Sequence, residues 1–341
     1  MAPVAPFRIT LQPSGHSFES DGSDTVLQAA LDAGLTLPYG CRNGACGACK
    51  GKVLEGLVDH GQAQDTALPT SDRAAGMTLF CCAKPLSDLV LEVREVGTAR
   101  DIPVKILPCR VQQIERCAED VIVLSLKLPA NERLQFLAGQ YIEFLLKDGK
   151  RRAFSIANAP HDDGFLQLHV RLIPGGEFTG HVFGAMKEKD ILRFQGPYGS
   201  FFLREESTKP MILLAGGTGF APIKSLVEHA IHQGITRSIE LYWGARNRAG
   251  LYLPELPLSW ARTHAQIRYL PVLSDATPAD AWDGRTGLVH RAVLEDHADL
   301  SGYQVYACGA PAMIDAARAE FAAAGLPTEE FFADSFTFMT T

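Results

Sequence analysis

The sequence predicts a multidomain chain whose three parts belong to different fold classes: α+β, then all-β, then α/β. Three observations favour this order. Three of the eight cysteines fall in a glycine-rich stretch near the N-terminus, where strand and helix patterns mix, and the next follows 32 positions later. The middle of the chain shows strand patterns at short intervals, and from Met211 the rhythm becomes strand, glycine turn, helix, strand. A length of 341 residues also favours two or three domains.

Composition and charge exclude several classes of protein. A hydrophobic fraction of 46% is ordinary for a globular protein, and a net charge of −7 disfavours a nucleic-acid or anionic-membrane partner. The longest apolar runs are far too short to span a membrane. The N-terminal residues lack a basic flank followed by an apolar stretch, so no signal peptide is expected. Cysteines without a secretory signal predict a cytoplasmic protein.

The first region alternates between strand and helix patterns. Residues 25–33 carry helical periodicity, and Gly34 is a plausible helix stop. Strands are predicted over 7–11, 51–55 and 89–95, with a turn at 13–15. A short mixed sheet with a helix across it is similar to the β-grasp fold of ferredoxins.

The spacing of the N-terminal cysteines predicts an iron–sulfur site. Cys41, Cys46 and Cys49 form a C-x4-C-x2-C run, and Cys81 follows 32 positions later. This is the plant-type spacing that holds a [2Fe-2S] cluster on four thiolates. The glycines and alanines between the ligands suit a loop that wraps a cluster and aims backbone N–H groups at the sulfurs.

Other interpretations of these cysteines are weaker. A zinc site usually pairs C-x2-C with a second such pair or with two histidines, and neither is present. A thioredoxin-like pair would need a strand before it and a helix after it. Spacing alone leaves the fourth ligand open between Cys81 and Cys82. The stretch 78–85 resembles the end of the ferredoxin motif, which favours Cys81 and makes Cys82 a buried small hydrophobe. Cys109 and Cys117 are interpreted as free buried thiols.

Composition separates the remaining regions. From about Val96 to Pro103 no apolar period is present, which predicts a linker. Strand patterns then follow over 121–128, 141–146 and 166–172, and their close spacing favours a barrel. The predicted division is a first domain over 1–96, a linker over 97–103, an antiparallel β-barrel over 104–207 and a parallel-sheet nucleotide-binding domain over 208–341.

Several motifs in the second and third regions carry chemistry. Two lie in the barrel, over 152–155 and 175–179, and three in the last domain, over 211–223, 242–246 and 305–313. A glycine turn between a strand and a helix lets the backbone and the helix N-terminus approach a pyrophosphate. Taken singly, three of them have simpler explanations: an exposed arginine on a strand, a plain hairpin turn and a core cysteine at a strand end.

Taken together, these motifs resemble the ferredoxin–NADP reductase superfamily. With the leading ferredoxin, the chain resembles the reductase components of multicomponent oxygenases and CDP-6-deoxy-Δ3,4-glucoseen reductase. The resemblance implies an FAD site in the barrel: Arg152 on the pyrophosphate, Phe154 on the flavin and Ser155 near flavin N5. It also implies FAD contacts from the residues Gly175, Gly176, Thr179, His169, Val170 and Arg171, although a strand with alternating faces would present the last three in the same way.

The resemblance further implies a nicotinamide site. Thr218 would lie near the ring, and Cys308 would lie beside the carbon that gives up hydride, so Ser155 and Cys308 are the expected catalytic residues. Other dinucleotide contacts are expected from Gly216, Gly217, Gly219, Arg246 and Gly309. An aromatic residue near the C-terminus often covers the flavin in this family. Phe336 is the expected one, while core packing is expected for at least two of Phe331, Phe332 and Phe336.

These expectations combine into one electron path. Nicotinamide gives two electrons as hydride and a [2Fe-2S] cluster takes one at a time, so a flavin must stand between them. The predicted protein therefore passes electrons from NADH, or from NADPH, through FAD to the cluster and on to a protein acceptor. The acceptor would be a dehydratase of deoxysugar synthesis or, alternatively, an aromatic or alkane oxygenase component. A diaphorase with a small-molecule acceptor and a redox-sensing module are the other hypotheses.

Overall fold

The computed structural model describes residues 6–96 and 102–336. The chain divides after Ile102 into two compact units, which are described separately. The predicted linker lies mostly outside the described residues, and the predicted boundaries at 96, 103 and 207 stay predictions. None of the described helices has the length and apolar character needed to cross a membrane.

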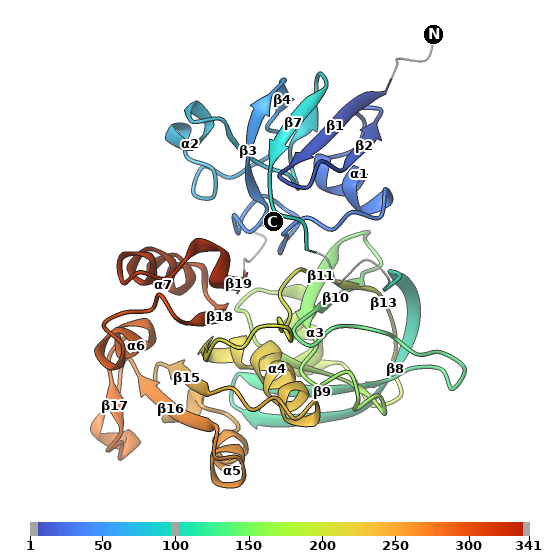
Figure 1. The fold of residues 1–341 in the computed structure, drawn as a ribbon. Helices are drawn as coiled ribbons and strands as arrows, with labels where there is room; N and C mark the ends of the chain where they lie inside the picture. The colour runs from blue at the N-terminus through green and yellow to red at the C-terminus, as the bar shows by residue number, and fades with distance from the viewer. Residues whose placement is uncertain (1–5, 97–101, 337–341) are drawn as a thin grey trace. The chain divides into compact units, whose positions relative to one another are not determined.

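The first unit is a small mixed sheet with short helices (Figure 1). Its elements are β1 (Phe7–Gln12), β2 (Ser17–Ser20), α1 (Val26–Asp32), β3 (Lys50–Glu55), β4 (Val58–Asp59), α2 (Thr70–Ala74), β5 (Met77–Leu79), β6 (Lys84–Pro85) and β7 (Leu89–Glu92). Five strands pair in the order β2-β1-β7-β3-β5, with β1 and β7 parallel.

Local chemistry fixes the helix of this unit. The Thr25 side chain accepts a hydrogen bond from the backbone N–H of Gln28 and caps α1, as a threonine at this position commonly does. Gly34 has a φ of 77° and ends the helical region, as the sequence predicts. Ile9 and Leu11 on one face of β1, and Val26 and Ala30 on α1, are fully buried and form part of the core.

The second unit begins with an antiparallel barrel. Its elements are β8 (Lys105–Ala118), β9 (Val121–Lys127), β10 (Tyr141–Leu145), β11 (Arg151–Ser155), β12 (Leu166–Arg171), α3 (Glu177–Gly184) and β13 (Ile191–Tyr198). The six strands pair in the order β11-β10-β13-β8-β9-β12. An antiparallel bridge between Ile156 and Leu168 joins the two edges of this sheet, so the prediction of a barrel is confirmed.

A parallel sheet follows the barrel. Its elements are β14 (Met211–Gly216), η2 (Gly217–Gly219), α4 (Phe220–His232), β15 (Ile239–Ala245), η3 (Arg248–Gly250), α5 (Glu255–Thr263), β16 (Ile267–Leu273), η4 (Pro278–Asp280), β17 (Arg285–Thr286), α6 (Val289–Asp296), β18 (Gln304–Gly309), α7 (Pro311–Ala323), η5 (Thr328–Glu330) and β19 (Phe331–Ser335). The strand order is β17-β16-β15-β14-β18-β19.

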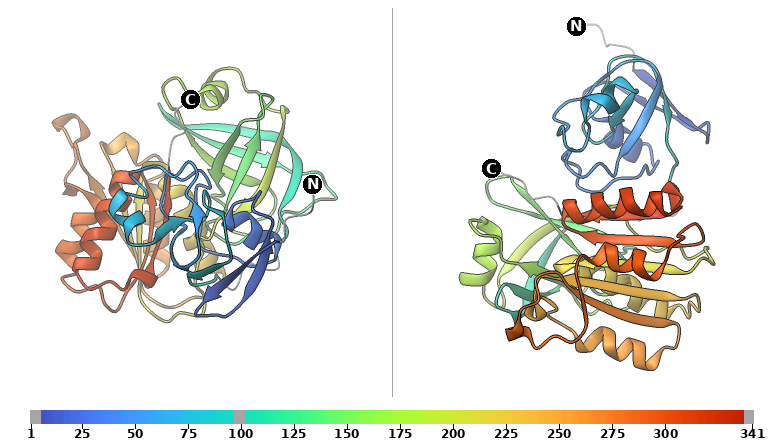
Figure 2. Two further views of the ribbon diagram at one scale, coloured as in Figure 1. Left: turned by 90° about the horizontal axis from the view of Figure 1, so that it is seen from above. Right: turned by 90° about the vertical axis from the view of Figure 1, so that its left-hand side faces the viewer.

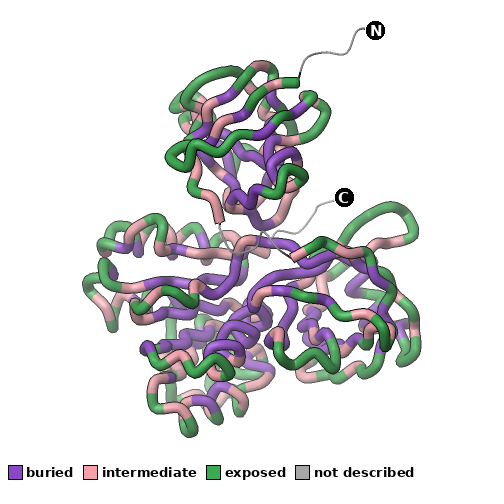
Figure 3. Tube along the Cα trace, turned by 45° about the vertical axis from the view of Figure 1, so that its right-hand side comes forward, coloured by how far each residue is buried: buried purple, intermediate pink, exposed green. Residues whose placement is uncertain are grey.

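Helices cover both faces of this parallel sheet (Figures 1 and 2). One core cluster joins Leu213 and Leu241 of the sheet to residues of α4 and α5, and a second joins Ile212 and Leu214 to α6 and α7. The central strands are buried on both faces, and Figure 3 shows them in purple. The prediction of a parallel-sheet α/β domain is confirmed.

The barrel and the parallel sheet pack closely within the second unit. Phe201 and Leu203, which follow the last barrel strand, belong to the same core cluster as α4. The Ser225 hydroxyl of α4 donates to the backbone carbonyl of Asn158 at 2.8 Å. The two halves of the predicted reductase therefore form one packed body, so residues from both can build one site.

Candidate functional site

Three of the predicted cluster ligands, Cys41, Cys46 and Cys49, lie on a tight loop between α1 and β3, and Cys81 lies between β5 and β6. Gly44 and Gly47 have φ values of 79° and 69°, in the left-handed region that glycine adopts without strain. A Cβ atom on Gly40 would lie 3.2 Å from the Cys46 Sγ. The small residues of the motif therefore have the role that the sequence predicts, because the loop winds closely around the sulfur atoms.

The three thiols of this loop and the thiol of Cys81 interact in two pairs. The backbone N–H of Cys41 points to the Cys46 Sγ at 3.4 Å. The Cys46 thiol, together with backbone N–H groups of the loop, lowers the pKa of Cys41 to about 6, although burial acts in the opposite direction. Interaction with the Cys49 thiol is the main cause that raises the pKa of Cys81. Cys41 thus pairs with Cys46, and Cys49 pairs with Cys81.

Two pairs of cysteines fit a two-iron cluster, in which each iron takes two thiolates. In residues 6–96 and 102–336, no three His, Cys, Asp or Glu side chains converge where a single metal ion could be held. Cys81 and Cys82 both interact with each other and with Cys41, but of the two only Cys81 also interacts with Cys49. This geometry supports the predicted ligand set, which stays a prediction.

The first flavin motif lies on β11, an edge strand of the barrel sheet. The Phe154 ring packs against Phe178 with ring centroids 5.3 Å apart. The Arg152 guanidinium donates to the carbonyl of Arg151 at 2.8 Å and is partly exposed. Ser155 is buried, and its hydroxyl donates to the Asp334 carboxylate at 3.3 Å. The motif therefore presents a cation, an aromatic ring and a hydroxyl along one short strand.

The alternation of β12 divides its three predicted contacts between two faces. Val170 belongs to the barrel core, so only its backbone could reach a cofactor. His169 points the other way, and its Nδ1 lies 2.7 Å from the Tyr252 hydroxyl. Burial, with a smaller effect of Lys224, lowers the pKa of His169 to about 3, so this imidazole is neutral.

Arg171 extends from the barrel and places its guanidinium beside the glycine turn of the parallel sheet. A Cβ atom on Gly217 would lie 3.1 Å from the Arg171 Nη1. Among the described residues, the buried Nε of Arg171 makes no hydrogen bond, and it forms an ion pair with an Asp120 carboxylate oxygen at 3.4 Å. A guanidinium placed at a glycine turn suits a pyrophosphate group. The residues present thus fit a dinucleotide.

The turn at 175–176 is closed by its own residues. Gly175 has a φ of 75°, and a Cβ atom on Gly176 would lie 2.6 Å from the Thr179 Oγ1. The Thr179 hydroxyl accepts from the backbone N–H of Ile173 at 3.2 Å, so it is already used within the turn. The backbone N–H groups at the start of α3 remain the better candidates for the pyrophosphate contact predicted here.

The second glycine turn lies where two neighbouring parallel strands end. Ala215 of β14 pairs in register with Cys308 of β18. A Cβ atom on Gly219 would lie 2.1 Å from the Cys308 carbonyl oxygen, and one on Gly309 would lie 2.8 Å from Met313. The turn at 216–219 and the strand end at 308–309 therefore approach so closely that only glycine fits at these positions.

Cys308 shares this strand end with a residue that the sequence reasoning missed. Asp334 of β19 pairs in register with Cys308 and is buried. Burial first, and the Asp334 carboxylate second, raise the pKa of Cys308, which remains a neutral thiol. Ser155, Cys308 and Asp334 thus meet although they are far apart in the chain. An acidic residue in the mostly apolar strand pattern 331–336 was the available signal.

All three C-terminal aromatic residues pack against the core. Phe331 is buried near Phe321, and Phe332 stacks on Tyr306 with ring centroids 4.9 Å apart. Phe332 and Phe336 are both partly buried against one core cluster, so core packing of at least two of the three is confirmed. The backbone N–H of Phe336 donates to the Gly309 carbonyl at 2.8 Å, which leaves this residue next to the predicted nicotinamide turn.

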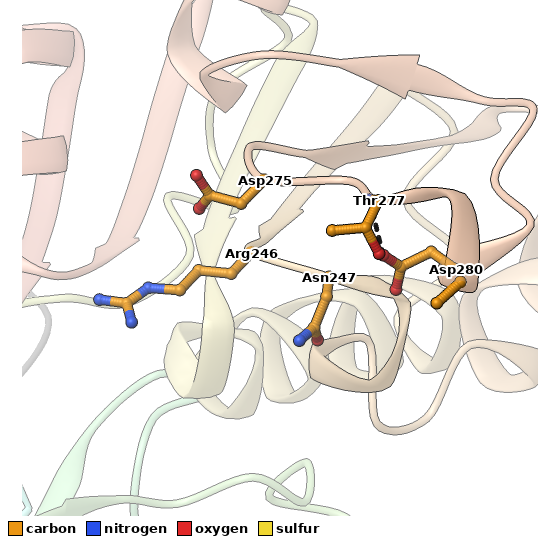
Figure 4. A pocket seen from close by; sticks show the side chains of 6 residues that line it. Arg246, Asn247, Asp275, Thr277 and Asp280 are labelled. Atoms are coloured by element: carbon orange, nitrogen blue, oxygen red, sulfur yellow. Dashed lines mark hydrogen bonds between the residues drawn. The ribbon is translucent and has the colours of Figure 1, made fainter.

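Arg246 lines an open cavity of about 710 Å³ beyond the ends of β15 and β16 (Figure 4). The Asp280 carboxylate already accepts hydrogen bonds from the backbone N–H and hydroxyl of Thr277 and from the backbone N–H of Arg248. These hydrogen bonds lower its pKa. Arg246 and Asp275 lie together at one end of the cavity, joined by a backbone hydrogen bond of 2.8 Å. Thr218 is buried within the second glycine turn, 216–219.

Comparison with known proteins agrees with this geometry. Three family models match the chain in order: a 2Fe-2S iron-sulfur cluster binding domain over 9–86, an oxidoreductase FAD-binding domain over 108–203 and an oxidoreductase NAD-binding domain over 213–319. A CDP-6-deoxy-L-threo-D-glycero-4-hexulose-3-dehydrase reductase of Yersinia pestis is 44% identical over 330 residues, which are 96% of this chain and 98% of that protein. The chain belongs to the ferredoxin–NAD(P)H reductase family with an N-terminal [2Fe-2S] domain.

Other members of this reductase family match over the same length. Reductase component 1 of the terephthalate 1,2-dioxygenase of a Comamonas species is 37% identical over 333 residues. These residues are 96% of this chain and 97% of that protein. The crystal structure of the cytochrome P450 reductase GcoB of Amycolatopsis has a TM-score of 0.78 at 33% identity and covers 97% of this chain and 98% of its own. As a family member, the chain is an NAD(P)H-dependent flavin iron–sulfur oxidoreductase whose cofactors are a [2Fe-2S] cluster, FAD and NAD(H).

Proposed function

We propose that this reductase supplies electrons from NADH to a dehydratase that acts on a CDP-linked deoxyhexulose. The observation that carries the proposal is the 44% identity, over nearly both whole chains, to a protein named as the reductase of such a dehydratase. A reductase component of an aromatic oxygenase is the second candidate, supported by 37% identity over a similar length. An intact nicotinamide turn argues against a protein that only senses redox state.

The described residues support a specific assignment of the cofactors. Cys41, Cys46, Cys49 and Cys81 would hold the cluster, because their thiols lie in two pairs on and beside one glycine-rich loop. The barrel residues with the β11 motif and Arg171 would hold FAD, while the turn 216–219 would hold the nicotinamide dinucleotide. When bound, FAD accepts a hydride and releases electrons singly.

The chain's own groups would then orient the reacting rings. Ser155, Cys308 and Asp334 are buried, and the first and last are joined by a hydrogen bond, so each has little freedom to move. Such fixed groups would hold the nicotinamide and flavin rings in close alignment. Close alignment is the main contribution to the rate when hydride moves directly from one ring to the other. No general base is needed.

The acceptor can be identified by reconstitution. The purified holoenzyme should be mixed anaerobically with NADH and either a CDP-hexulose dehydratase or a terephthalate-type oxygenase component, and NADH oxidation followed. We expect substrate-dependent NADH oxidation with the dehydratase and much slower oxidation with the oxygenase. The reverse order would contradict the proposed acceptor. Reduction of both flavin and cluster by NADH, at about three electrons per chain, would confirm the internal path separately.

The preference for NADH over NADPH rests on the cavity near Arg246. The Asp275 carboxylate lies at the same end of this cavity, where it could accept hydrogen bonds from ribose hydroxyls and would repel a 2′-phosphate. Substitution of Asp275 by asparagine should raise the ratio of kcat/KM for NADPH to that for NADH at least about tenfold, because one like charge is removed.

Steady-state kinetics with both coenzymes check this expectation. Asp283→Asn is a matched control, since Asp283 is exposed nearby but does not line the cavity. An unchanged coenzyme ratio in the Asp275 variant, or a wild-type preference for NADPH, would show that the carboxylate does not select the dinucleotide.

A further inference from the structure

Cys82 stands beside the proposed cluster ligands without belonging to them. Its Sγ lies 3.7 Å from the Cys81 Sγ, within the range of a hydrogen bond between sulfur atoms. The residue is partly buried, and its thiol is not part of the Cys41–Cys46 and Cys49–Cys81 pairs. A contact of this kind places a weak donor directly on a cluster ligand.

The position of Cys82 is set by two glycines. A Cβ atom on Gly44 would lie 2.6 Å from the Cys82 Sγ, and one on Gly61 would lie 2.6 Å from the Cys82 carbonyl oxygen. Gly44 belongs to the cluster loop itself. Both glycines have positive φ values, 79° and 55°. The absence of a side chain at Gly44 and Gly61 thus leaves room for Cys82 beside the cluster loop.

The direction of this hydrogen bond follows from the protonation state of Cys81 when it holds iron. A cysteine that holds iron has lost its proton, so Cys81 can then only accept and Cys82 must donate through its S–H. Hydrogen bonds to ligand sulfurs stabilise the added negative charge of a reduced cluster and raise its reduction potential.

We propose that Cys82 is a positioning residue for the cluster, which donates an S–H hydrogen bond to the Cys81 sulfur and thereby makes the cluster easier to reduce. The inference rests on the proposed ligand set, in which Cys81 is the fourth ligand. The step adds one electron to the cluster and breaks no bond. The donor helps electrons from the flavin to reach the cluster, and it holds the Cys81 side chain in place.

The test compares Cys82→Ala with Cys82→Ser in the full-length holoprotein. Serine keeps a donor of similar size, whereas alanine removes it. Both variants should keep two irons per chain and the visible bands of the wild type. Redox titration should show a loss of up to about tenfold in the equilibrium constant for cluster reduction in the alanine variant, which is up to about 59 mV for a one-electron couple. The serine variant should lie at or above the wild-type potential.

Two controls separate this proposal from its alternatives. Cys117→Ala changes a partly buried cysteine in the other unit and should leave the potential unchanged. Cys81→Ala should lose the cluster.

The proposal would be overturned by an unchanged potential in Cys82→Ala, or by equal losses of potential in the alanine and serine variants. Loss of iron from Cys82→Ala but not from Cys81→Ala would instead make Cys82 the ligand. Flavin reduction by NADH should persist in every variant, so a failure there would point to the proposed reductase path and not to Cys82.

Discussion

Substitution of Cys41 by serine should remove the cluster while leaving the flavin half active. Cys41 pairs with Cys46, and backbone N–H groups of the loop point at its sulfur, so its loss takes one of two thiolates from an iron. We expect iron content to fall severely and the turnover of NADH with cytochrome c to drop at least about 100-fold. Reduction of FAD by NADH, measured by bleaching of the flavin band, should continue.

The matched control for this experiment is Cys117→Ser, which changes a cysteine of the barrel. Its iron content and cytochrome c turnover should equal those of the wild type. A Cys41 variant that kept full iron content and turnover would mean that the cluster is held by other residues. A simultaneous loss of flavin would show that the variant had misfolded.

Substitution of Gly219 by alanine should have the largest effect on the nicotinamide half. The new Cβ would lie 2.1 Å from the carbonyl oxygen of Cys308 and 3.0 Å from the backbone nitrogen of Gly309. Since both contacts are backbone atoms, neither can rotate away, and the ends of β14 and β18 must separate. We expect about 1–3 kcal/mol of lost stability. The rate of flavin reduction by NADH should fall about 100-fold, because a shift near 1 Å misaligns the rings.

Stopped-flow flavin reduction and thermal unfolding check this result against Gly180→Ala. A Cβ on Gly180 meets nothing within 4 Å, and this glycine lies inside α3. The control should gain about 0.5–1 kcal/mol from helix propensity and keep its rate of flavin reduction. A normal rate in the Gly219 variant would show that the close approach to Cys308 does not align the dinucleotide.

Much of the fold followed from local patterns. The alternation of Ile9 and Leu11 and the helical period before Gly34 predicted β1 and α1 because each depends on neighbouring residues. The fourteen residues of β8 were not predicted. Its buried residues Leu107, Cys109 and Val111 alternate with exposed ones, but the second half is mostly polar and is specified by pairing with β9.

The site was predictable where one segment carries its own chemistry. The cluster loop and both glycine turns are of this kind. The bond between Ser155 and Asp334 joins residues 179 positions apart, and the approach of Arg171 to Gly217 joins the barrel to the parallel sheet. Such contacts depend on how two domains pack, which no local pattern records. Likewise, the choice between Cys81 and Cys82 depends on the direction of two adjacent side chains.

The close packing of Gly216, Gly219 and Gly309 has a consequence for how this enzyme can change. The proposed nicotinamide turn is built mainly from main-chain atoms, which every amino acid supplies alike. Met313 is the side chain that packs against Gly216 and Gly309, whereas a methyl group added at Gly219 would meet the Cys308 carbonyl and damage the shape of the turn. Proteins of this design can therefore change their electron acceptor through surface residues and the cluster unit, while the proposed nicotinamide site stays the same.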